Sequence, residues 1–332
     1  MTIKKISIAI LILLGLIFTS IFFVQEKIEN YLTISRIDKT MLFTVSAGSN
    51  FYLLGDQLEE QAIVNDLTWW KIVAKLHPEF TKIKSGTYQF QEGANLEDMF
   101  TILNQGIEYQ FKVTFVEGST FREWLATLAN AEALAPLVNS EKEILQQLGS
   151  PHSKLEGLLL PETYHYHAQM SAFKIIERAY LQQLQTLDAL WAERDKNLPL
   201  KTPYEVLILA SIIEKESSIS VDRDKIASVF INRLRKGIRL QTDPTVIYGM
   251  GDNYQGRIRT KDLREKTAYN TYRINGLPPT PICMPSEAAL YATLHPAKTD
   301  YLYFVSKGDG SSYFSKNLVE HNRAVQKYIL GK

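Results

Sequence analysis

The amino-acid sequence predicts an α+β protein with an N-terminal transmembrane helix, a small α+β unit and a larger α+β domain. The chain has 332 residues, enough for about two domains that each bury a core. Residues 6–24 form one uncharged apolar run. Beyond this run, short segments rich in β-formers alternate with longer segments whose apolar residues recur at helical spacing. The composition, 45% hydrophobic and 22% charged, excludes a wholly disordered chain.

The charge balance and the cysteine count exclude several classes of protein. Lys and Arg number 37 against 36 Asp and Glu, so the net charge is only +1 and we expect no nucleic-acid partner. Cys283 is the one cysteine, which excludes an intrachain disulfide and a thiolate metal cluster. His165 and His167 could point the same way from a strand, but no third ligand has suitable spacing. The sequence therefore predicts neither a metal site nor a cofactor.

The apolar run at residues 6–24 is long enough to cross a lipid bilayer. Its nineteen residues span about 28 Å as a helix. A cleaved signal peptide is the competing interpretation, but the run exceeds the usual apolar core of such peptides, and VQEKIEN after it lacks a small-x-small cleavage site. We therefore expect an uncleaved, single-pass anchor. Lys4 and Lys5 predict that residues 1–5 are a cytoplasmic tail and that the rest is extracytoplasmic.

The next part of the chain predicts a helical stalk at residues 25–40 and a small unit at residues 41–107. Within the small unit, one helix is expected in residues 51–64, with Leu53, Leu54, Leu58 and Ala62 at roughly helical spacing. The other predicted elements are a strand from Met41, a helix from Trp69 stopped by Pro78, a strand within residues 84–93, and a helix capped by Asn95 and ended by Gly106.

Residues 108–332 predict the larger domain. The expected elements begin with a strand at 109–116, a helix from Phe121 and a helix from Pro203 to Glu216. A further helix is expected at about 222–236, with a buried stripe formed by Ile226, Val229, Phe230 and Leu234. A C-terminal helix is expected to pack through Leu318, His321, Val325 and Ile329. Asp243-Pro244 and Gly249 predict loop and turn, and residues 268–286 hold four prolines and predict an irregular loop.

The helix ending at Glu216 carries the most informative pattern. Thr202 and Pro203 predict its start, with Glu205 completing a capping-box pattern. Leu209, Ile212 and Ile213 share one face, and Glu216 continues it, whereas Glu214 projects to a polar edge with Ser211 and Lys215. A carboxyl among aliphatic groups keeps its proton to higher pH and can act as a general acid. Alternatively, Glu216 is solvated beyond the helix end or paired with Arg223.

The proline-rich loop carries Tyr269, Asn270 and Tyr272. Aromatic rings and amides on a stiff loop suit carbohydrate, because rings stack on sugar C–H faces and amides bind hydroxyls. A rigid structural loop with buried tyrosines explains the same residues equally well, so both interpretations stay open at this stage.

Long segments of the chain resemble a known family. ILASIIEKE, RDKIASVFINRLRKGIRLQTDPTVIYGMG, AYNTYRINGLPPTPI and LHPAKTDYLYFV are similar to the endolytic murein transglycosylases of the YceG-like family. KSGTYQF, within residues 41–107, and VEGSTFREW, which follows them, resemble that family's small LysM-like region, and residues 41–107 are assigned as the LysM-like unit. The resemblance implies an enzyme of the bacterial inner membrane that cuts nascent peptidoglycan strands between N-acetylmuramic acid and N-acetylglucosamine without water. It would leave 1,6-anhydro ends, terminate strand elongation and contact peptidoglycan synthases.

The resemblance also assigns roles to single residues. Glu216 matches the family's catalytic acid/base, the second glutamate of its E-K-E motif, and Glu214 would be a supporting residue at most. Glu156 begins a match to E-G-x-x-x-P-[DE]-T-Y, in which Leu160 replaces the usual aromatic residue and Glu162 the common Asp, so a close catalytic role for Glu162 is not expected. The remaining motif positions would line the sugar cleft: Gln241, Thr242, Asp243, Tyr248, Tyr269, Asn270 and Tyr272.

One glutamate would suffice for this chemistry. Retaining glycosidases use a second carboxylate as nucleophile, whereas here the C6 hydroxyl of the muramic acid attacks its own C1 with the advantage of an intramolecular reaction. Two other functions remain possible. A hydrolytic muramidase would share the substrate and the acid but release a reducing end. A non-catalytic scaffold would bind peptidoglycan without cutting it.

Overall fold

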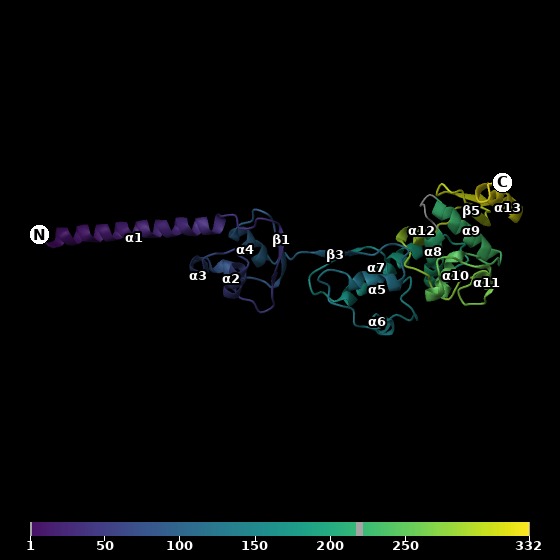
Figure 1. Ribbon diagram of the computed structural model, residues 1–332, viewed down its shortest axis with the longest axis horizontal. Helices are drawn as coiled ribbons and strands as arrows, with labels where there is room; N and C mark the ends of the chain where they lie inside the picture. The colour runs from purple at the N-terminus through teal and green to yellow at the C-terminus, as the bar shows by residue number, and fades with distance from the viewer. Residues whose placement is uncertain (1, 217–221, 332) are drawn as a thin grey trace. The chain divides into compact units, whose positions relative to one another are not determined.

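The structure, a computed structural model, describes residues 2–216 and 222–331 and is mixed helix and sheet, as the sequence predicts. It divides into two compact units (Figure 1). The first comprises residues 1–111 with residues 167–169, and the second comprises residues 112–166 with residues 170–332.

The first unit begins with a long helix, α1 (Thr2–Thr33), drawn in purple in Figure 1. Among the described residues, it is the one helix long and apolar enough to cross a membrane. Helix α1 continues beyond the apolar run, and its Ile28, Tyr31 and Leu32 are buried in the core of the small unit together with Ile37. Residues 25–40, expected to form a stalk, therefore contribute directly to that core.

The rest of the first unit packs three helices around a two-stranded antiparallel sheet. Strand β1 (Met41–Val45) pairs with β2 (Gly86–Phe90) in the register Met41↔Phe90 to Val45↔Gly86. The helices are α2 (Phe51–Glu60), α3 (Leu67–Leu76) and α4 (Leu96–Gln105), with a 3₁₀ turn at Pro78–Thr81. The expected boundaries of α4 are confirmed, because Asn95 forms a capping box with Asp98 and Gly106 takes a φ of 73°.

The apolar face predicted for α2 is partly wrong. Leu54 and Leu58 are buried, but Leu53 is 48% exposed. Ala62 lies beyond the helix end with a φ of 58°. Because the helix begins at Phe51, which is buried, its core face runs through residues 51, 54 and 58 instead.

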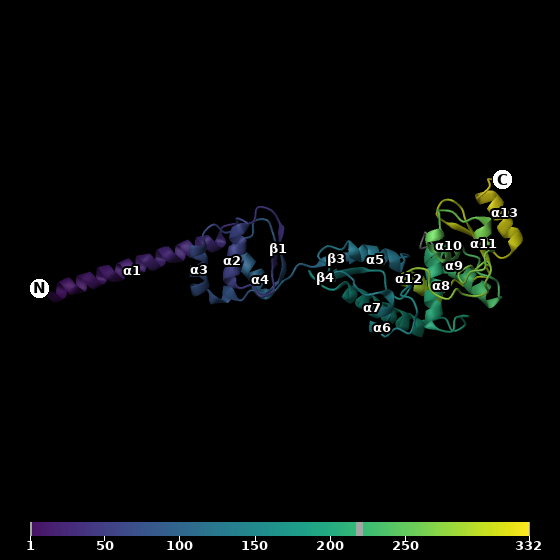
Figure 2. The same ribbon diagram turned by 60° about the horizontal axis from the view of Figure 1, so that its bottom comes forward.

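The second unit is organised around α8 (Pro203–Glu216), whose residues 206–213 are all buried. Helices α7 (Ala172–Glu193), α9 (Arg223–Arg235), α10 (Asp243–Met250) and α12 (Glu287–Leu294) pack against it. In Figure 2 both α12 and α9 lie beside α8, and these two helices also contact each other. The polar edge predicted at Ser211 is therefore wrong: a central helix is covered all round. Ser211 is fully buried, donates to Ile208 O at 2.8 Å and accepts from Ile282 N at 3.0 Å.

The first segment of this unit contains several short elements. Strand β3 (Phe111–Thr114) pairs with β4 (Thr163–Tyr166), and α5 (Phe121–Ala129) and α6 (Glu141–Gln147) lie between them in sequence. On β4, Tyr164 and Tyr166 are buried whereas His165 is exposed. The expected strand at 109–116 and the helix from Phe121 are confirmed.

One segment predicted as loop and turn is a helix. Asp243-Pro244 opens α10, because proline is tolerated in the first turn, where the missing N–H has no helical partner. Gly249 lies inside this helix, and a Cβ there would come within 2.9 Å of the Tyr269 Cβ. After α10 come a 3₁₀ turn at Gly251–Asn253 and α11 (Thr260–Arg264). Residues 268–286 contain no helix or strand, as predicted.

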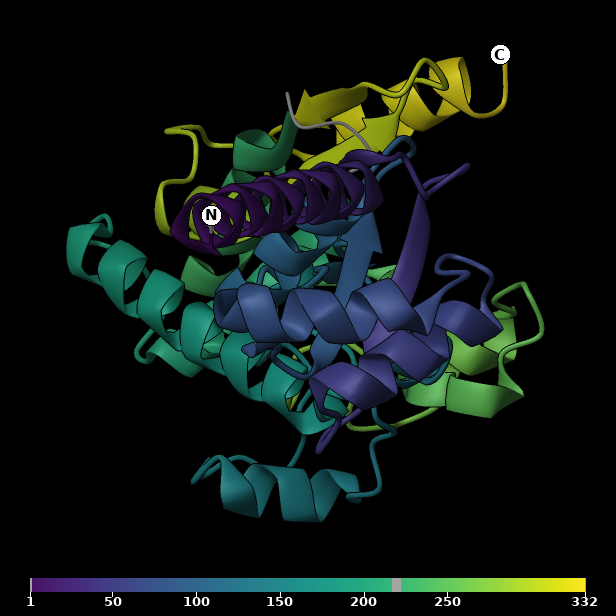
Figure 3. The ribbon, with the colours of Figure 1, turned by 90° about the vertical axis from the view of Figure 1, so that its left-hand side faces the viewer.

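The chain ends in a hairpin covered by a helix. Strands β5 (Tyr303–Ser306) and β6 (Ser312–Ser315) pair antiparallel, and α13 (Leu318–Tyr328) lies against them (Figure 3). The packed face of α13 is centred on Ala324, which is buried, with His321 and Val325 partly buried beside it. Leu318 and Ile329, predicted on this face, are 54% and 56% exposed and lie at its margins.

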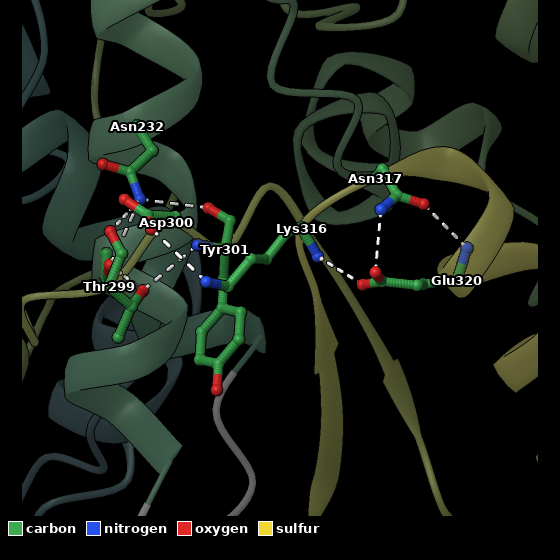
Figure 4. Close-up of polar contacts among 8 residues, drawn as sticks. Asn232, Thr299, Asp300, Tyr301, Lys316, Asn317 and Glu320 are labelled. Atoms are coloured by element: carbon green, nitrogen blue, oxygen red, sulfur yellow. Dashed lines mark hydrogen bonds and ion pairs between the residues drawn. The ribbon is translucent and has the colours of Figure 1, made fainter.

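Polar contacts join this hairpin to α9 (Figure 4). Asn232 on α9 donates to Thr299 O at 2.8 Å and to Tyr301 O at 3.1 Å. Lys316 pairs with Asp300 at 3.4 Å, and Asn317 caps α13 by accepting from Glu320 N at 3.0 Å. The Asn232 contacts hold the segment that leads into β5 against α9, and α13 in turn contacts β5, so these elements form a wall of the cleft described next.

Candidate active site

The last turn of α8 directs three consecutive side chains to three different partners. Glu214 accepts from the Ser286 backbone N–H at 2.9 Å, and Lys215 donates to Gly118 O at 3.2 Å. Glu216 accepts a hydrogen bond from the Thr242 hydroxyl through its Oε1. The end of α8 is therefore fixed on several sides, and Glu216 is the side chain that reaches a cavity.

Glu216 lies in a cleft of about 380 Å³ between the end of α8, the start of α10, and the elements α9, β5 and α13. Two carboxyl groups line this cleft, Glu216 and Asp243. The other lining residues are Phe230, Arg233, Leu240, Gln241, Tyr272, Tyr303, Phe304, Leu318 and His321. Acidic, basic and aromatic side chains thus converge in one concave site, and such convergence of polar groups is typical of a ligand-binding site.

The surroundings of Glu216 favour its protonated form. Burial is the largest effect and raises the pKa of the Glu216 carboxyl, and the Asp243 carboxylate raises it further. The Thr242 hydrogen bond and the Arg233 charge act in the opposite direction, and the net shift is upward. The sequence left open that Glu216 is solvated beyond the helix end or is paired with Arg223. The structure excludes the pairing, because Arg223 pairs with Glu214 at 3.4 Å.

The segments at residues 241–245 and 269–272 meet beside Glu216. Thr242 N donates to the Thr271 hydroxyl at 3.0 Å, and the Thr245 hydroxyl donates to Thr242 O at 2.8 Å. Tyr272 donates its hydroxyl proton to Asp243 Oδ1 at 2.7 Å. Gln241 has a φ of 52°, an unusual conformation for a residue with a side chain and one that often occurs at functional sites. The start of α10 and residues 270–272 thus form one side of the cleft.

Arg233 supports the opposite side and was missed by sequence reasoning. Its Nε donates to Leu302 O at 2.6 Å, its Nη1 donates to Leu240 O at 2.7 Å, and its guanidinium lies 4.9 Å from the Tyr303 ring centroid. The signal was present in the sequence, since Arg233 follows Val229 and Phe230 at helical spacing on an otherwise apolar face. Tyr303, Phe304 and His321 line the same side and were not predicted as site residues; the sequence placed His321 only on the packed face of the C-terminal helix.

Other predicted residues lie elsewhere. Glu156, Tyr248 and Tyr269 line a second cavity of about 420 Å³. Asn270 is fully buried and donates to Asp262 O and Glu265 O at 3.1 and 2.6 Å, so it holds the loop together. Glu162 is exposed and lines neither of these two cavities. Within the described residues, no group of three or more His, Cys, Asp or Glu side chains is arranged to hold a metal ion.

Comparison with known proteins places the chain in a family. Residues 43–327 match the sequence model of the YceG-like family. A Bacillus subtilis protein named endolytic murein transglycosylase is 32% identical over 88% of this chain and 86% of its own length. A Streptococcus pneumoniae protein of the same name is 27% identical over 99% of this chain and 66% of its own length. The crystal structure of a YceG-like protein from Listeria monocytogenes is 29% identical, with a TM-score of 0.54 over 86% of this chain and 98% of that one. The chain belongs to the YceG-like family.

Proposed function

We propose that this protein is a lytic transglycosylase that cuts peptidoglycan strands internally, at the β-1,4 bond between N-acetylmuramic acid and N-acetylglucosamine. The observation that carries the proposal is the Glu216 carboxyl, which lies in a cleft where burial raises its pKa. A carboxyl that keeps its proton to higher pH can protonate a leaving oxygen. The activity named for the relatives from Bacillus subtilis and Streptococcus pneumoniae supports the same choice.

The proposed reaction uses Glu216 twice. The protonated carboxyl gives its proton to the glycosidic oxygen as the bond between that oxygen and C1 of muramic acid breaks. The C6 hydroxyl of the same sugar then attacks C1, and the Glu216 carboxylate takes the hydroxyl proton. The carboxyl is thus restored, and the strand ends in a 1,6-anhydro ring. The Thr242 hydrogen bond to Oε1 orients the group for both transfers.

Asp243 favours a second candidate function. This carboxylate lines the same cleft as Glu216 and is held by the Tyr272 hydroxyl. A second carboxylate facing the sugar could act as general base for a water molecule, as in hydrolytic glycosidases. The protein would then be a muramidase with the same acid, and its products would carry reducing ends instead of anhydro ends.

The N-terminal helix completes the proposal. Residues 6–24 of α1 anchor the protein in the bacterial inner membrane, residues 1–5 are cytoplasmic, and the second unit acts outside the cytoplasm. The length and apolar character of α1 support this placement. The small unit at residues 41–107 serves as a LysM-like module on the glycan strand. In this position the enzyme ends the elongation of new strands beside the peptidoglycan synthases that make them.

Mass spectrometry of the products tests the proposed function. The full chain in detergent micelles is incubated with uncrosslinked glycan strands, and the fragments are weighed. Shortened strands with anhydro ends support the transglycosylase. Fragments heavier by one water identify a muramidase, and strands that are bound but keep their length identify a non-catalytic scaffold.

A further inference from the structure

A second groove lies in the same unit as the cleft, and the proposed chemistry does not use it. It consists of two adjoining cavities of about 420 and 320 Å³ that share Arg122, Lys154, Glu156 and Tyr248. One end is aromatic, with Tyr254 and Tyr269, and the other end runs along α5 and α6, with Leu125, Asn139, Glu141 and Ile144. We call this surface the Lys154 groove.

Lys154 lies in the middle of this groove and offers a positive charge to both ends. Its Nζ lies 5.3 Å from the Tyr248 ring centroid and 5.6 Å from the Tyr269 ring centroid, and it contacts the Tyr248 hydroxyl at 3.4 Å. An ammonium group has three N–H donors, so this arrangement fixes the group in place and leaves it donors for a ligand. The side chain lines both cavities and is partly exposed.

Glu156, the carboxyl beside Lys154, is committed to other partners. It is only 6% exposed, and it accepts from Phe121 N at 3.0 Å and from the Tyr248 hydroxyl at 3.1 Å. Burial raises the pKa of Glu156 to about 7, so near neutral pH a large fraction of this carboxyl is uncharged. Glu141 also lines the groove, and its Oε1 accepts from Leu155 N at 2.7 Å. Among the described residues neither carboxyl group forms an ion pair with Lys154, so the groove suits an anionic group such as a carboxylate.

The groove is within reach of a molecule held in the catalytic cleft. Helix α10 joins the two sites, with Asp243 in the cleft and Tyr248 in the groove, five residues or about 8 Å apart along the helix. Residues 269–272 join them a second time, because Tyr269 lines the groove and Tyr272 lines the cleft. An extended pentapeptide spans about 16 Å, enough to reach from a sugar in the cleft into the groove.

We propose that the Lys154 groove binds the stem peptide of the muramic acid held in the cleft, with Lys154 binding a peptide carboxylate. The inference rests on the proposed function, since that substrate carries a peptide on its muramic acid. The groove matches the mixed chemistry of such a peptide. Lys154 meets a carboxylate, Leu125 offers apolar contact to alanine methyl groups, and Glu141 provides a carboxylate for the ammonium of a diamino acid.

The test compares two forms of the same strands, one with stem peptides and one stripped of them by an amidase. Lys154→Met in the full chain should raise KM for peptide-bearing strands on the order of tenfold, the effect expected from loss of one hydrogen bond to a charged group. It should leave the stripped strands unchanged. Lys154→Arg should restore most of the loss, and Lys196→Met, which removes an exposed lysine elsewhere in this unit, should change neither substrate.

A direct binding measurement separates this inference from the proposed function. The free stem pentapeptide is titrated against the full chain and followed by calorimetry. Glu216→Gln should bind the peptide like the wild type, and Lys154→Met should bind it on the order of tenfold more weakly. If the peptide binds in this way but no strand is cut, the proposed function is wrong and the assignment of the Lys154 groove as a peptide-binding site is supported. If Lys154→Met affects both strand forms equally or neither, or if the peptide does not bind, the inference is overturned.

Discussion

The buried carboxyl of Glu156 predicts a pH dependence of stability that one substitution should remove. Its pKa is raised from 4.5 to about 7 in the folded protein, so the folded state holds this proton more tightly than the unfolded state does. The stabilisation is complete below pH 4.5 and is lost as the pH rises through 7. A difference of about 2.5 units corresponds to about 3 kcal/mol. Glu156→Gln keeps the shape of the protonated acid and never ionises.

We therefore expect the free energy of unfolding of Glu156→Gln, relative to the wild type, to rise by about 3 kcal/mol between pH 4 and pH 8. Hydrogen exchange followed by mass spectrometry on peptides from α8 measures this for the second unit alone. Gln can accept from Phe121 N and donate to the Tyr248 hydroxyl, so both contacts of the acid are preserved. If the two proteins show parallel pH dependence, the argument from burial is refuted.

Four further substitutions, one of them a control, have expected outcomes. Asp243→Asn removes a negative charge that raises the pKa of Glu216, so the alkaline limb of the pH–rate profile should move to lower pH; an unmoved limb would contradict the assignment. Thr242→Val removes a hydrogen bond that lowers the same pKa, so this limb should move to higher pH, and a shift in the same direction as Asp243→Asn would count against the geometry. Gly157→Ala places a Cβ against Pro281 at a φ of 78° and should destabilise the second unit by about 3 kcal/mol or more. Gly149→Ala is its control: with a φ of 63° and open space around the added Cβ, it should cost only about 1 kcal/mol, and equal losses in thermal melts would exclude overlap with Pro281 as the cause.

Sequence patterns predicted the elements that carry local signals. The N-cap at Asn95, the stop at Pro78 and the irregular loop at 268–286 depend on nearby residues alone, and each was found. Glu216 could be singled out because its helix continues the apolar spacing of Ile212 and Ile213. Where tertiary packing decides, local patterns were insufficient. Nothing near Ser211 in sequence shows that Ile282 and Cys283 contact it, and Asp243-Pro244 has the same sequence signal in a turn as in the first turn of a helix.

The division of the site residues also depends on tertiary structure. Tyr269 and Tyr272 are three residues apart, yet one lines the Lys154 groove and the other the catalytic cleft. Glu214 and Glu216 are two apart, yet Glu214 pairs with Arg223 and binds Ser286, whereas Glu216 reaches the cleft. Arg233 enters the site through contacts with Leu302, about seventy residues further along the chain, which no local pattern can show.

The catalytic role of Glu216 is tested most directly by Glu216→Gln, assayed as the rate of strand shortening by the full chain. The amide has nearly the same size and can still bind Thr242, so circular dichroism should show an unchanged fold. It cannot give or take the proton, and the rate should fall by at least about 100-fold, as expected for loss of a general acid/base. A folded variant that keeps more than about a tenth of the wild-type rate would contradict the assignment of Glu216 as the acid/base.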